Sequence, residues 1–497
     1  MTKRAKTIIA AIAVSAVALS AAAASAVALS PLSVQELVIS RDAVYQTLKG
    51  FGVSGAWWAQ GLTDETFSKK VAKALFSENS LNLNLYRYNV GAGEQSASKR
   101  RVYSDRATES FYYFNESTKK YEYDFTRDAA AYAFLLNALD GTLKEVVLFA
   151  NSPHYSMTVS GSASGNDRAY TLNLKADSFD DFAEYLTKIA AYFIENGIPV
   201  SYISPLNEPQ WSWGGENVSQ EGCHYEPAHV AELGKILYEY LKMNDVNAKI
   251  SLFESGSLAL KDVKPYLSAL SREEAFKNSD HVSLHSYWAD GNIRVRKKLR
   301  KYLDRTVPDK EVHMTEWCEL PSEHSADDID SAIILSRTLS NDLNYLNAVT
   351  WYAWKGYEEV PPGIVGSPEN RTDSLLYGVQ ATGELYAAKR YYALMHYSAF
   401  WEPGSVRVGA KIGKGIASAQ NEKNLPVTAF VTPSGKTVAV ITNTTSVSKS
   451  VSLGAETGRS VNIYVTDKER NTEKVFSGGA PETLDIAAKS IVTLVIE

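Results

Sequence analysis

Short apolar segments alternate with amphipathic segments over most of the chain, beginning near Gly50. Each apolar segment ends in a loop that contains Gly, Asn, Trp or Pro. A short buried run bounded by turn residues is typical of a strand in a parallel sheet. The pattern predicts eight such strands, at residues 50–55, 83–89, 145–150, 202–206, 249–253, 281–285, 311–315 and 348–353.

Helical periodicity separates these strands, because apolar residues recur there every three or four positions. The clearest predicted helices cover residues 177–196, 226–243, 263–276, 293–303 and 326–344. Strands alternating with helices in this way predict a (β/α)8 TIM barrel, whose active site is built by the loops after the strands. A doubly wound open sheet is the alternative, but no Gly-x-Gly-x-x-Gly phosphate turn follows any strand.

The pattern changes near residue 401 to short alternating runs separated by turn signals, at residues 427–432, 437–442, 461–466 and 490–496. These runs predict a small antiparallel β-sandwich. Two alternating segments before Gly50, at 36–40 and 43–48, are expected to be a pair of strands that completes this sandwich. The predicted division is therefore a signal peptide, N-terminal sandwich strands, a catalytic barrel and a sandwich domain, at residues 1–26, 34–49, 50–400 and 401–497.

The amino terminus has the three-part pattern of a secretory signal peptide. Lys3, Arg4 and Lys6 precede an apolar run that ends near Ala24, and residues 24–26 fit the small-x-small cleavage rule. An uncleaved membrane anchor is the alternative. No later run is long and apolar enough to span a bilayer, so we expect a secreted protein with no membrane contact after cleavage. We expect it to be a monomer.

Charge and aromatic content narrow the possible partners. The formal net charge is −6, which argues against a nucleic-acid partner, since such proteins need clustered Lys and Arg. The 9 Trp and 29 Tyr exceed the needs of a core of this size, so many of these rings are expected at the surface or in a cleft. Flat rings with a polar tip suit the faces of sugars or protein interfaces. Together with the acidic pair described below, they lead us to expect a polysaccharide or oligosaccharide substrate.

Metal and cofactor chemistry find little support in the sequence. The chain has 8 His and 2 Cys, without His-Glu-x-x-His, Cys-x-x-Cys, a Walker loop or a Gly-x-Ser-x-Gly elbow. We expect neither a metal nor a cofactor. Cys223 and Cys318 follow two acidic strand ends and could pair across the site, or could remain free and partly buried.

Those two strand ends carry the candidate chemistry. Glu208 lies between Asn207 and Pro209, and the proline must end the strand because it has no N–H to donate. Glu316 ends the seventh predicted strand in the same way. On one barrel rim the two carboxyl groups would face each other, which is the arrangement that glycosidic cleavage needs.

Other predicted strand ends supply suitable neighbours. Arg87, on the second strand, could hold a nucleophilic carboxylate in its ionised form, although a structural ion pair is an alternative. His285 and Tyr287 follow the sixth strand, where a phenol could hydrogen-bond the nucleophile. Tryptophans at strand ends favour a sugar-stacking cleft over a purely structural role, and the candidates are Trp57, Trp58, Trp211 and Trp354.

Five motifs together resemble glycoside hydrolase family 30, within the clan of (β/α)8 retaining glycosidases. They are Gly50-Phe-Gly-Val-Ser-Gly-Ala-Trp-Trp-Ala, Tyr86-Arg-Tyr-Asn-Val-Gly-Ala-Gly, Asn151-Ser-Pro-His-Tyr-Ser-Met-Thr, Pro205-Leu-Asn-Glu-Pro-Gln and Met314-Thr-Glu-Trp. The resemblance runs from about Val34 to the carboxyl terminus. It implies a barrel fused to a side β-sandwich that the amino-terminal strands complete.

The resemblance also implies roles for individual residues. Glu208 would be the acid/base and Glu316 the nucleophile of a retaining double displacement, while Asn207 would contact the 2-hydroxyl of the transferred sugar. The segment from Asn151 to Gly165 looks most like the endo-β-1,6-galactanase branch of the family. Members acting on glucosylceramide, β-1,6-glucan or xylan more often have Trp-Met-Lys after the Ser-Pro.

The sequence therefore predicts a secreted retaining endo-glycosidase that acts on β-1,6-galactan side chains of arabinogalactan. A family 30 enzyme acting on glucuronoxylan or β-1,6-glucan is one alternative. A carbohydrate-binding relative that keeps the fold without turnover is another.

Overall fold

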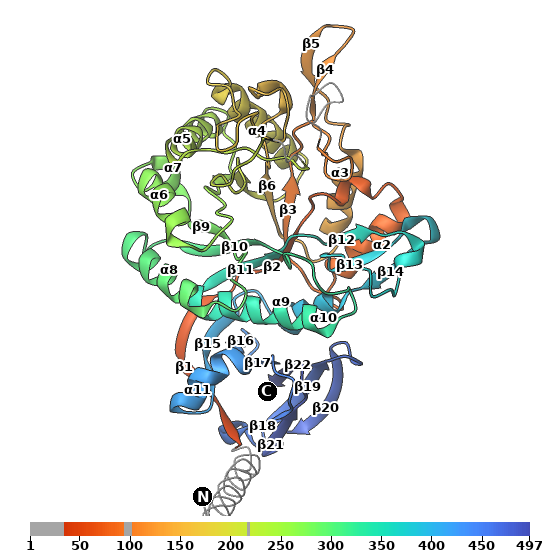
Figure 1. Cartoon of the computed structure of the whole chain (residues 1–497), viewed down its shortest axis with the longest axis vertical. Helices are drawn as coiled ribbons and strands as arrows, with labels where there is room; N and C mark the ends of the chain where they lie inside the picture. The colour runs from red at the N-terminus through yellow and green to blue at the C-terminus, as the bar shows by residue number, and fades with distance from the viewer. Residues whose placement is uncertain (1–33, 94–101, 216–218) are drawn as a thin grey trace, which may run out of the picture.

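The computed structural model describes residues 34–93, 102–215 and 219–497, arranged as a barrel above a smaller β-sandwich (Figure 1). The predicted signal peptide at 1–26 lies outside these residues. Within the described part of the chain, every helix is too short or too polar to cross a lipid bilayer.

Eight parallel strands form the barrel sheet, as predicted. In chain order they are β2 (Gly50–Ser54), β3 (Leu85–Asn89), β6 (Glu145–Phe149), β7 (Val200–Ser204), β8 (Lys249–Ile250), β9 (His281–His285), β10 (Glu311–Trp317) and β11 (Ala348–Ala353). The sheet closes between β8 and β9 through a bridge at Ser255. There the Ser255 N–H donates to the carbonyl of Ser283 at 3.2 Å, and the His285 N–H donates to the carbonyl of Ser255 at 2.8 Å.

Strand β8 is shorter than the predicted 249–253. Phe253 and Glu254 have φ values of 79° and 21°, so the backbone leaves the extended region before the predicted end. The other barrel strands agree with the prediction to within a few residues.

At least one helix follows each barrel strand. These helices are α2 (Glu65–Leu75), α3 (Ala129–Leu139), α4 (Phe179–Glu195), α5 (Pro227–Met243), α6 (Leu260–Leu270), α7 (Glu274–Asn278), α8 (Ile293–Thr306), α9 (Ile329–Asn341) and α10 (Lys389–Ser398). Their starts follow local chemistry: the side chain of Asp64, for example, caps α2 by accepting from the N–H of Phe67 at 2.7 Å. The single helix predicted at 263–276 is wrong, because extended backbone at Glu273 separates α6 from α7.

Short elements decorate the barrel loops. They comprise the hairpin β4 (Tyr112–Asn115) and β5 (Lys120–Tyr123), the small sheet β12 (Tyr357–Glu359), β13 (Leu376–Val379) and β14 (Glu384–Ala387), the π-helical turn η3 (Asp342–Leu346), and the 3-10 turns η1 (Ala59–Gly61), η2 (Tyr155–Met157), η4 (Pro362–Ile364) and η5 (Gln380–Thr382). The η3 turn continues α9 and completes the segment predicted as one helix at 326–344.

The sandwich contains the four predicted strands and several that the sequence did not reveal. Its carboxyl-terminal elements are β15 (Val406–Ile412), α11 (Gly415–Asn424), β16 (Val427–Val431), β17 (Thr437–Asn443), β18 (Lys449–Ser452), η6 (Gly454–Glu456), β19 (Ser460–Thr466), β20 (Glu473–Gly479), β21 (Thr483–Ile486) and β22 (Ser490–Ile496). Neighbouring strands pair antiparallel in the order β20-β19-β22-β17-β16-β15. Strands β18 and β21 form a further antiparallel pair.

The amino-terminal segment completes the sandwich, but as one strand and not as a pair. Strand β1 (Gln35–Thr47) runs antiparallel to β15 from Leu37 to Thr47, and its first residues pair in parallel with β18. Register irregularities after Ser40 and Val44 let one continuous strand run through the gap between the two predicted segments. The prediction of two strands is therefore wrong, whereas the predicted pairing with the sandwich is confirmed.

The sandwich and the barrel share a hydrophobic core. Phe430, Val438, Val440 and Ile491 belong to the same buried cluster as the barrel side chains, including Leu394 on α10. Polar contacts cross the same boundary: Thr493 Oγ1 lies 2.7 Å from Nδ1 of His396. The sandwich thus packs on α9 and α10 as part of one structural unit.

Truncation of Ile491 tests this shared core. Ile491→Ala removes a fully buried side chain and should lower the free energy of unfolding by about 2–5 kcal/mol, measured by urea denaturation. Ile416→Ala is the control, because Ile416 is 81% exposed and its truncation should change stability little. Equal stability of the two variants would contradict a core continuous across the boundary.

Candidate active site

Two glutamates meet at the carboxyl-terminal rim of the barrel, as the sequence predicted. Glu208 follows β7, and Glu316 lies near the end of β10; both are buried. One oxygen of each carboxyl group and one ring nitrogen of His285 all lie within 4.8 Å of one another. Glu208 has a left-handed φ of 46°, and its N–H donates to the carbonyl of Glu254 at 3.0 Å. This backbone bond fixes the direction in which the Glu208 side chain leaves the strand.

Both oxygens of Glu316 accept hydrogen bonds. Arg87 Nη1 donates to Oε2 at 2.9 Å, and the Tyr287 hydroxyl donates to Oε1 at 2.8 Å. Arg87 is fully buried, and its guanidinium lies 4.1 Å from the centre of the Phe149 ring. A buried cation and a phenol therefore hold the Glu316 carboxyl group in place through both of its oxygens.

His285 lies between two carboxylates. Nδ1 is 2.8 Å from Oε1 of Glu208, and Nε2 is 3.2 Å from Oε2 of Glu254. Burial alone would lower the pKa of His285, but Glu316, Glu208 and Glu254 together raise this pKa to about 9. The imidazole is therefore a cation at neutral pH, and both of its N–H groups donate.

Glu254 was not predicted, although it supports the other groups. Its carboxylate is fully buried and accepts from the hydroxyls of Ser204, Ser251 and Thr315. Burial would raise the pKa of Glu254, but Arg87 and His285 outweigh it and hold this pKa well below its usual range. Glu254 is therefore ionised at neutral pH and lies on the Nε2 side of His285, opposite Glu208.

Glu208 is shifted in the opposite direction. Burial raises the pKa of its carboxyl group, and the negative charge of Glu316 adds to the effect, while the bond from His285 opposes it. One carboxyl group of the pair is thus disposed to hold a proton, and the other is held by a cation.

The same three side chains are the candidate metal ligands among the described residues: Glu208, His285 and Glu316 each offer one atom. Their chemistry fits a metal poorly. Protonated His285 has no free lone pair, and Arg87 and Tyr287 already donate to Glu316. The cluster suits proton transfer better than metal binding.

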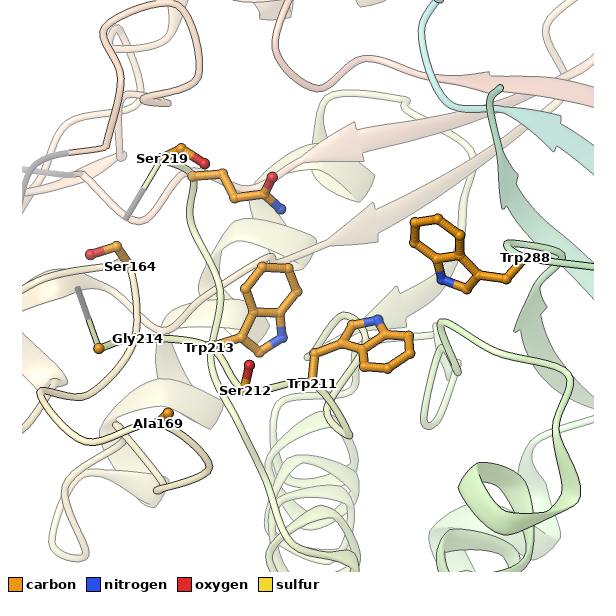
Figure 2. Close-up of a pocket in the computed structure, with 10 residues that line it drawn as sticks. Ser164, Ala169, Trp211, Ser212, Trp213, Gly214, Ser219 and Trp288 are labelled. Atoms are coloured by element: carbon orange, nitrogen blue, oxygen red, sulfur yellow. The ribbon is translucent and has the colours of Figure 1, made fainter. Parts of the chain in front are cut away.

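A cavity of about 270 Å³ opens directly above the two glutamates, and Asn207, Tyr287, Trp57, Trp211 and Trp354 also line it. A neighbouring cavity of about 630 Å³ shares four of its lining residues, Trp211, Trp213, Gln220 and Trp288. Figure 2 shows three of these indole rings lining that cavity from two different loops. A third cavity, of about 390 Å³, shares Trp57 and Arg106. The glutamates therefore lie in the middle of one elongated, aromatic cleft.

The predicted aromatic residues differ in their placement. The rings of Trp57 and Trp354 meet edge to face at 5.0 Å, and the Arg106 guanidinium lies 4.7 Å from the centre of the Trp57 ring. Trp58 is instead 4% exposed and packs on Phe134, with its Nε1 donating to the carbonyl of Ser54. Trp58 also lines the third cavity, of about 390 Å³, so its ring combines core packing with a place at one end of the cleft.

Asn151, another predicted site residue, bonds to a neighbouring strand end. It is buried, and its amide donates to Oδ1 of Asn89 at 3.2 Å. Asn151 is not among the described residues that line the cavity above the glutamates. Its placement supports the β3 and β6 strand ends instead.

The two cysteines are free and buried, in agreement with the alternative of unpaired thiols. Cys318 lines the cavity and lies 3.7 Å from the Tyr287 hydroxyl. Cys223 lies in the barrel core.

Comparison with known proteins agrees with the geometry. A family model described as O-glycosyl hydrolase family 30 matches residues 34–360, and one described as glycosyl hydrolase family 30 beta sandwich domain matches residues 404–494. The chain belongs to glycosyl hydrolase family 30. It is thus a glycoside hydrolase by family, with a glycan as its substrate.

Individual relatives agree with this family. The endo-beta-1,6-galactanase of Hypocrea rufa is 25% identical over 362 residues, which cover 68% of this chain and 70% of that protein. The crystal structure of a conserved exported protein from Bacteroides fragilis superposes with a TM-score of 0.78 at 23% identity, covering 93% of this chain and 100% of that one. The catalytic domain of GH30 xylanase C from Talaromyces cellulolyticus superposes with a TM-score of 0.69 at 18% identity, covering 93% of this chain and 100% of that one. At these two identities the structural likeness concerns the fold.

Replacement of Glu254 tests the charge balance of the site. Glu254→Gln removes one of the carboxylates that face His285, so the pKa of His285 should fall from about 9 by about 1 or more, followed by NMR of the imidazole resonances. Glu473→Gln, at an exposed position on β20, should leave this pKa unchanged. An unchanged pKa in folded Glu254→Gln would contradict the assigned interaction.

Proposed function

We propose that this protein hydrolyses β-1,6-galactan side chains of arabinogalactan by a retaining double displacement, with Glu316 as nucleophile and Glu208 as acid/base. The observation that carries the mechanism is the spacing of the two carboxyl groups, whose nearest oxygens lie within 4.8 Å. Retaining glycosidases have carboxyl groups about 5–5.5 Å apart, whereas inverting enzymes need about 6.5–9.5 Å to admit a water molecule. The separation therefore favours direct attack by one carboxylate.

In the first step, a carboxylate oxygen of Glu316 attacks the anomeric carbon while the bond to the leaving oxygen breaks. Glu208 transfers its proton to that oxygen, and a glycosyl ester of Glu316 remains. Arg87 and Tyr287 hold the Glu316 side chain oriented for the attack. The raised pKa of Glu208 keeps its proton available at higher pH than an ordinary glutamate would.

In the second step, Glu208 accepts a proton from water, and the resulting hydroxide attacks the anomeric carbon from the side that the leaving group vacated. The ester bond breaks, Glu316 leaves as a carboxylate, and the sugar keeps its original anomeric configuration. Protonated His285 donates to Glu208 throughout, so it can stabilise the carboxylate that forms after the first proton transfer.

The remaining predicted residues have binding roles in this proposal. Asn207 lines the cavity, and its Oδ1 accepts from Arg87 Nη2 at 3.4 Å, which places the amide beside the nucleophile for contact with the 2-hydroxyl. Trp57, Trp211 and Trp354 would stack on sugar rings.

The proposal that the enzyme cleaves inside the glycan and the proposal that this glycan is galactan are supported by different observations. The cleft continues on both sides of the glutamates, which suits an enzyme that binds sugar units before and after the cleaved bond. The galactan assignment is supported by the likeness to the Hypocrea rufa galactanase. The amino-terminal pattern supports secretion.

Neutralising the nucleophile tests the mechanism. Glu316→Gln keeps the shape of the side chain but removes its charge, so hydrolysis should fall about a thousandfold or more while oligosaccharide binding persists. The exposed control Glu473→Gln should keep the wild-type rate. Equal binding by wild type and Glu316→Gln without cleavage by either would favour a carbohydrate-binding relative, and an inverted first product in proton NMR would contradict the double displacement.

A substrate panel tests the choice of sugar. The purified protein should release oligosaccharides from β-1,6-galactan, and it should release much less from β-1,6-glucan or glucuronoxylan, measured by product chromatography. Activity confined to one of the other two glycans would reassign the substrate while leaving the catalytic roles intact. Absence of release from β-1,6-galactan would refute the galactanase assignment.

A further inference from the structure

A buried arginine without an acidic partner lies where the sandwich meets the barrel. Arg407, on β15, is 4% exposed. Its Nε donates to Oε1 of Gln46 at 2.8 Å, and its Nη2 donates to Oδ1 of Asn347 at 3.1 Å. Both acceptors are neutral amides. Among the described residues, no carboxylate forms an ion pair with the guanidinium, and the charged or polar rings beside it are those of Tyr45 and Tyr345.

Two other buried arginines of this chain, Arg87 and Arg296, are paired with carboxylates. Arg87 faces Glu316 and Glu254, and Arg296 donates to Asp342 at 2.7 Å. A buried charge is unfavourable unless an opposite charge compensates it. Burial accordingly lowers the pKa of Arg407 to about 10, which still leaves the group positively charged at neutral pH. Arg407 thus differs from these arginines in lacking a counter-ion.

Arg407 lines a cavity of about 330 Å³ between β1, β15 and the end of η3. Tyr45, on β1, covers one face of the guanidinium: the centre of its ring is 3.6 Å from the Arg407 guanidinium carbon. Tyr45 is 49% exposed, so one aromatic side chain separates the cation from solvent. The side chains of Ser40, Asn344 and Asn421 add hydroxyl and amide groups to the lining.

The cavity is cationic, although the chain has a net charge of −6. Lys411 lines it together with Arg407, and Glu422 is the single acidic residue among its described lining residues. Glu422 is itself paired with Lys297 at 3.0 Å. An anion that enters this cavity would therefore meet an excess of positive charge.

We propose that this cavity binds an acidic sugar, with the carboxylate of a uronic acid residue paired to Arg407 and its hydroxyl groups on the neighbouring amide and hydroxyl side chains. Guanidinium groups are suited to carboxylates because they can donate two parallel hydrogen bonds. The cavity shares no lining residue with the catalytic cleft, so this is a second site. Its presence does not depend on which glycan the glutamates cleave.

Calorimetric titration of the full chain with sodium glucuronate, glucose and sodium acetate tests the proposal. Glucuronate should bind saturably and more weakly at high salt, and glucose and acetate should each bind at least about tenfold more weakly. Absence of saturable glucuronate binding would overturn the proposal. Acetate binding as tight as that of glucuronate would also overturn it, since sugar recognition would then be lacking.

Two variants locate the binding. Arg407→Gln should abolish it, and persistence of wild-type affinity in this folded variant would overturn the proposal. Because loss of Arg407 also removes contacts across the domain boundary, the exposed Lys411 provides an independent variant. Lys411→Glu should weaken binding severalfold, whereas Lys474→Glu, with the same charge change on exposed β20, should leave it unaltered. Equal affinities of these two lysine variants would overturn the assignment.

Discussion

The buried guanidinium of Arg87 is the group on which the catalytic rim depends. Three acidic side chains, those of Glu208, Glu254 and Glu316, come together in the barrel interior. Among the described residues, the cations that pair with them are Arg87 and His285. Arg87 reaches two of these acids and also donates to the carbonyl of Thr315 at 3.0 Å. One side chain on β3 thereby supplies charge compensation and fixes the position of β10. Removal of one partner from such a buried network leaves uncompensated charge, which is strongly unfavourable.

Backbone conformation directs the other side chains toward this point. Trp57, Glu208, Glu254 and Trp288 all follow barrel strands, and all have left-handed φ values between 21° and 73°. Such conformations are unfavourable for residues with a Cβ and are found where the surrounding structure enforces them, often at functional sites. Gly256 shows how tightly this region is packed, because a Cβ there would lie 2.6 Å from Oε1 of Glu208. Left-handed backbone at these strand ends therefore directs Trp57, Glu208 and Trp288 into the cleft, whereas Glu254 stays buried behind His285.

The parts of the site that could be predicted have local sequence signals. Glu208 stands before a proline at the end of an apolar strand, and Glu316 ends a second such strand, so the rim arrangement followed once the eight strands were recognised. Glu254 has no comparable signal. Its strand ends early, and its partners, Arg87 and His285, are distant in sequence and meet it only when β8 and β9 close the barrel. Tertiary packing likewise distinguishes two adjacent tryptophans. Trp57 lines the cavity above the glutamates, whereas Trp58 packs on Phe134 and lines the outer cavity of about 390 Å³.

The pairing of β1 with β15 has a consequence for how the chain folds. Leu37 finds its partner Ile412 near the opposite end of the sequence. During synthesis at about 5–20 residues per second, β1 would stay without that partner for roughly 20 seconds or more. Contacts between residues so far apart in the sequence form late and slow the folding of the whole protein. Strand β1 therefore acts as a closing element: until the ribosome has released most of the sandwich, its unpaired edge is open to association with other chains.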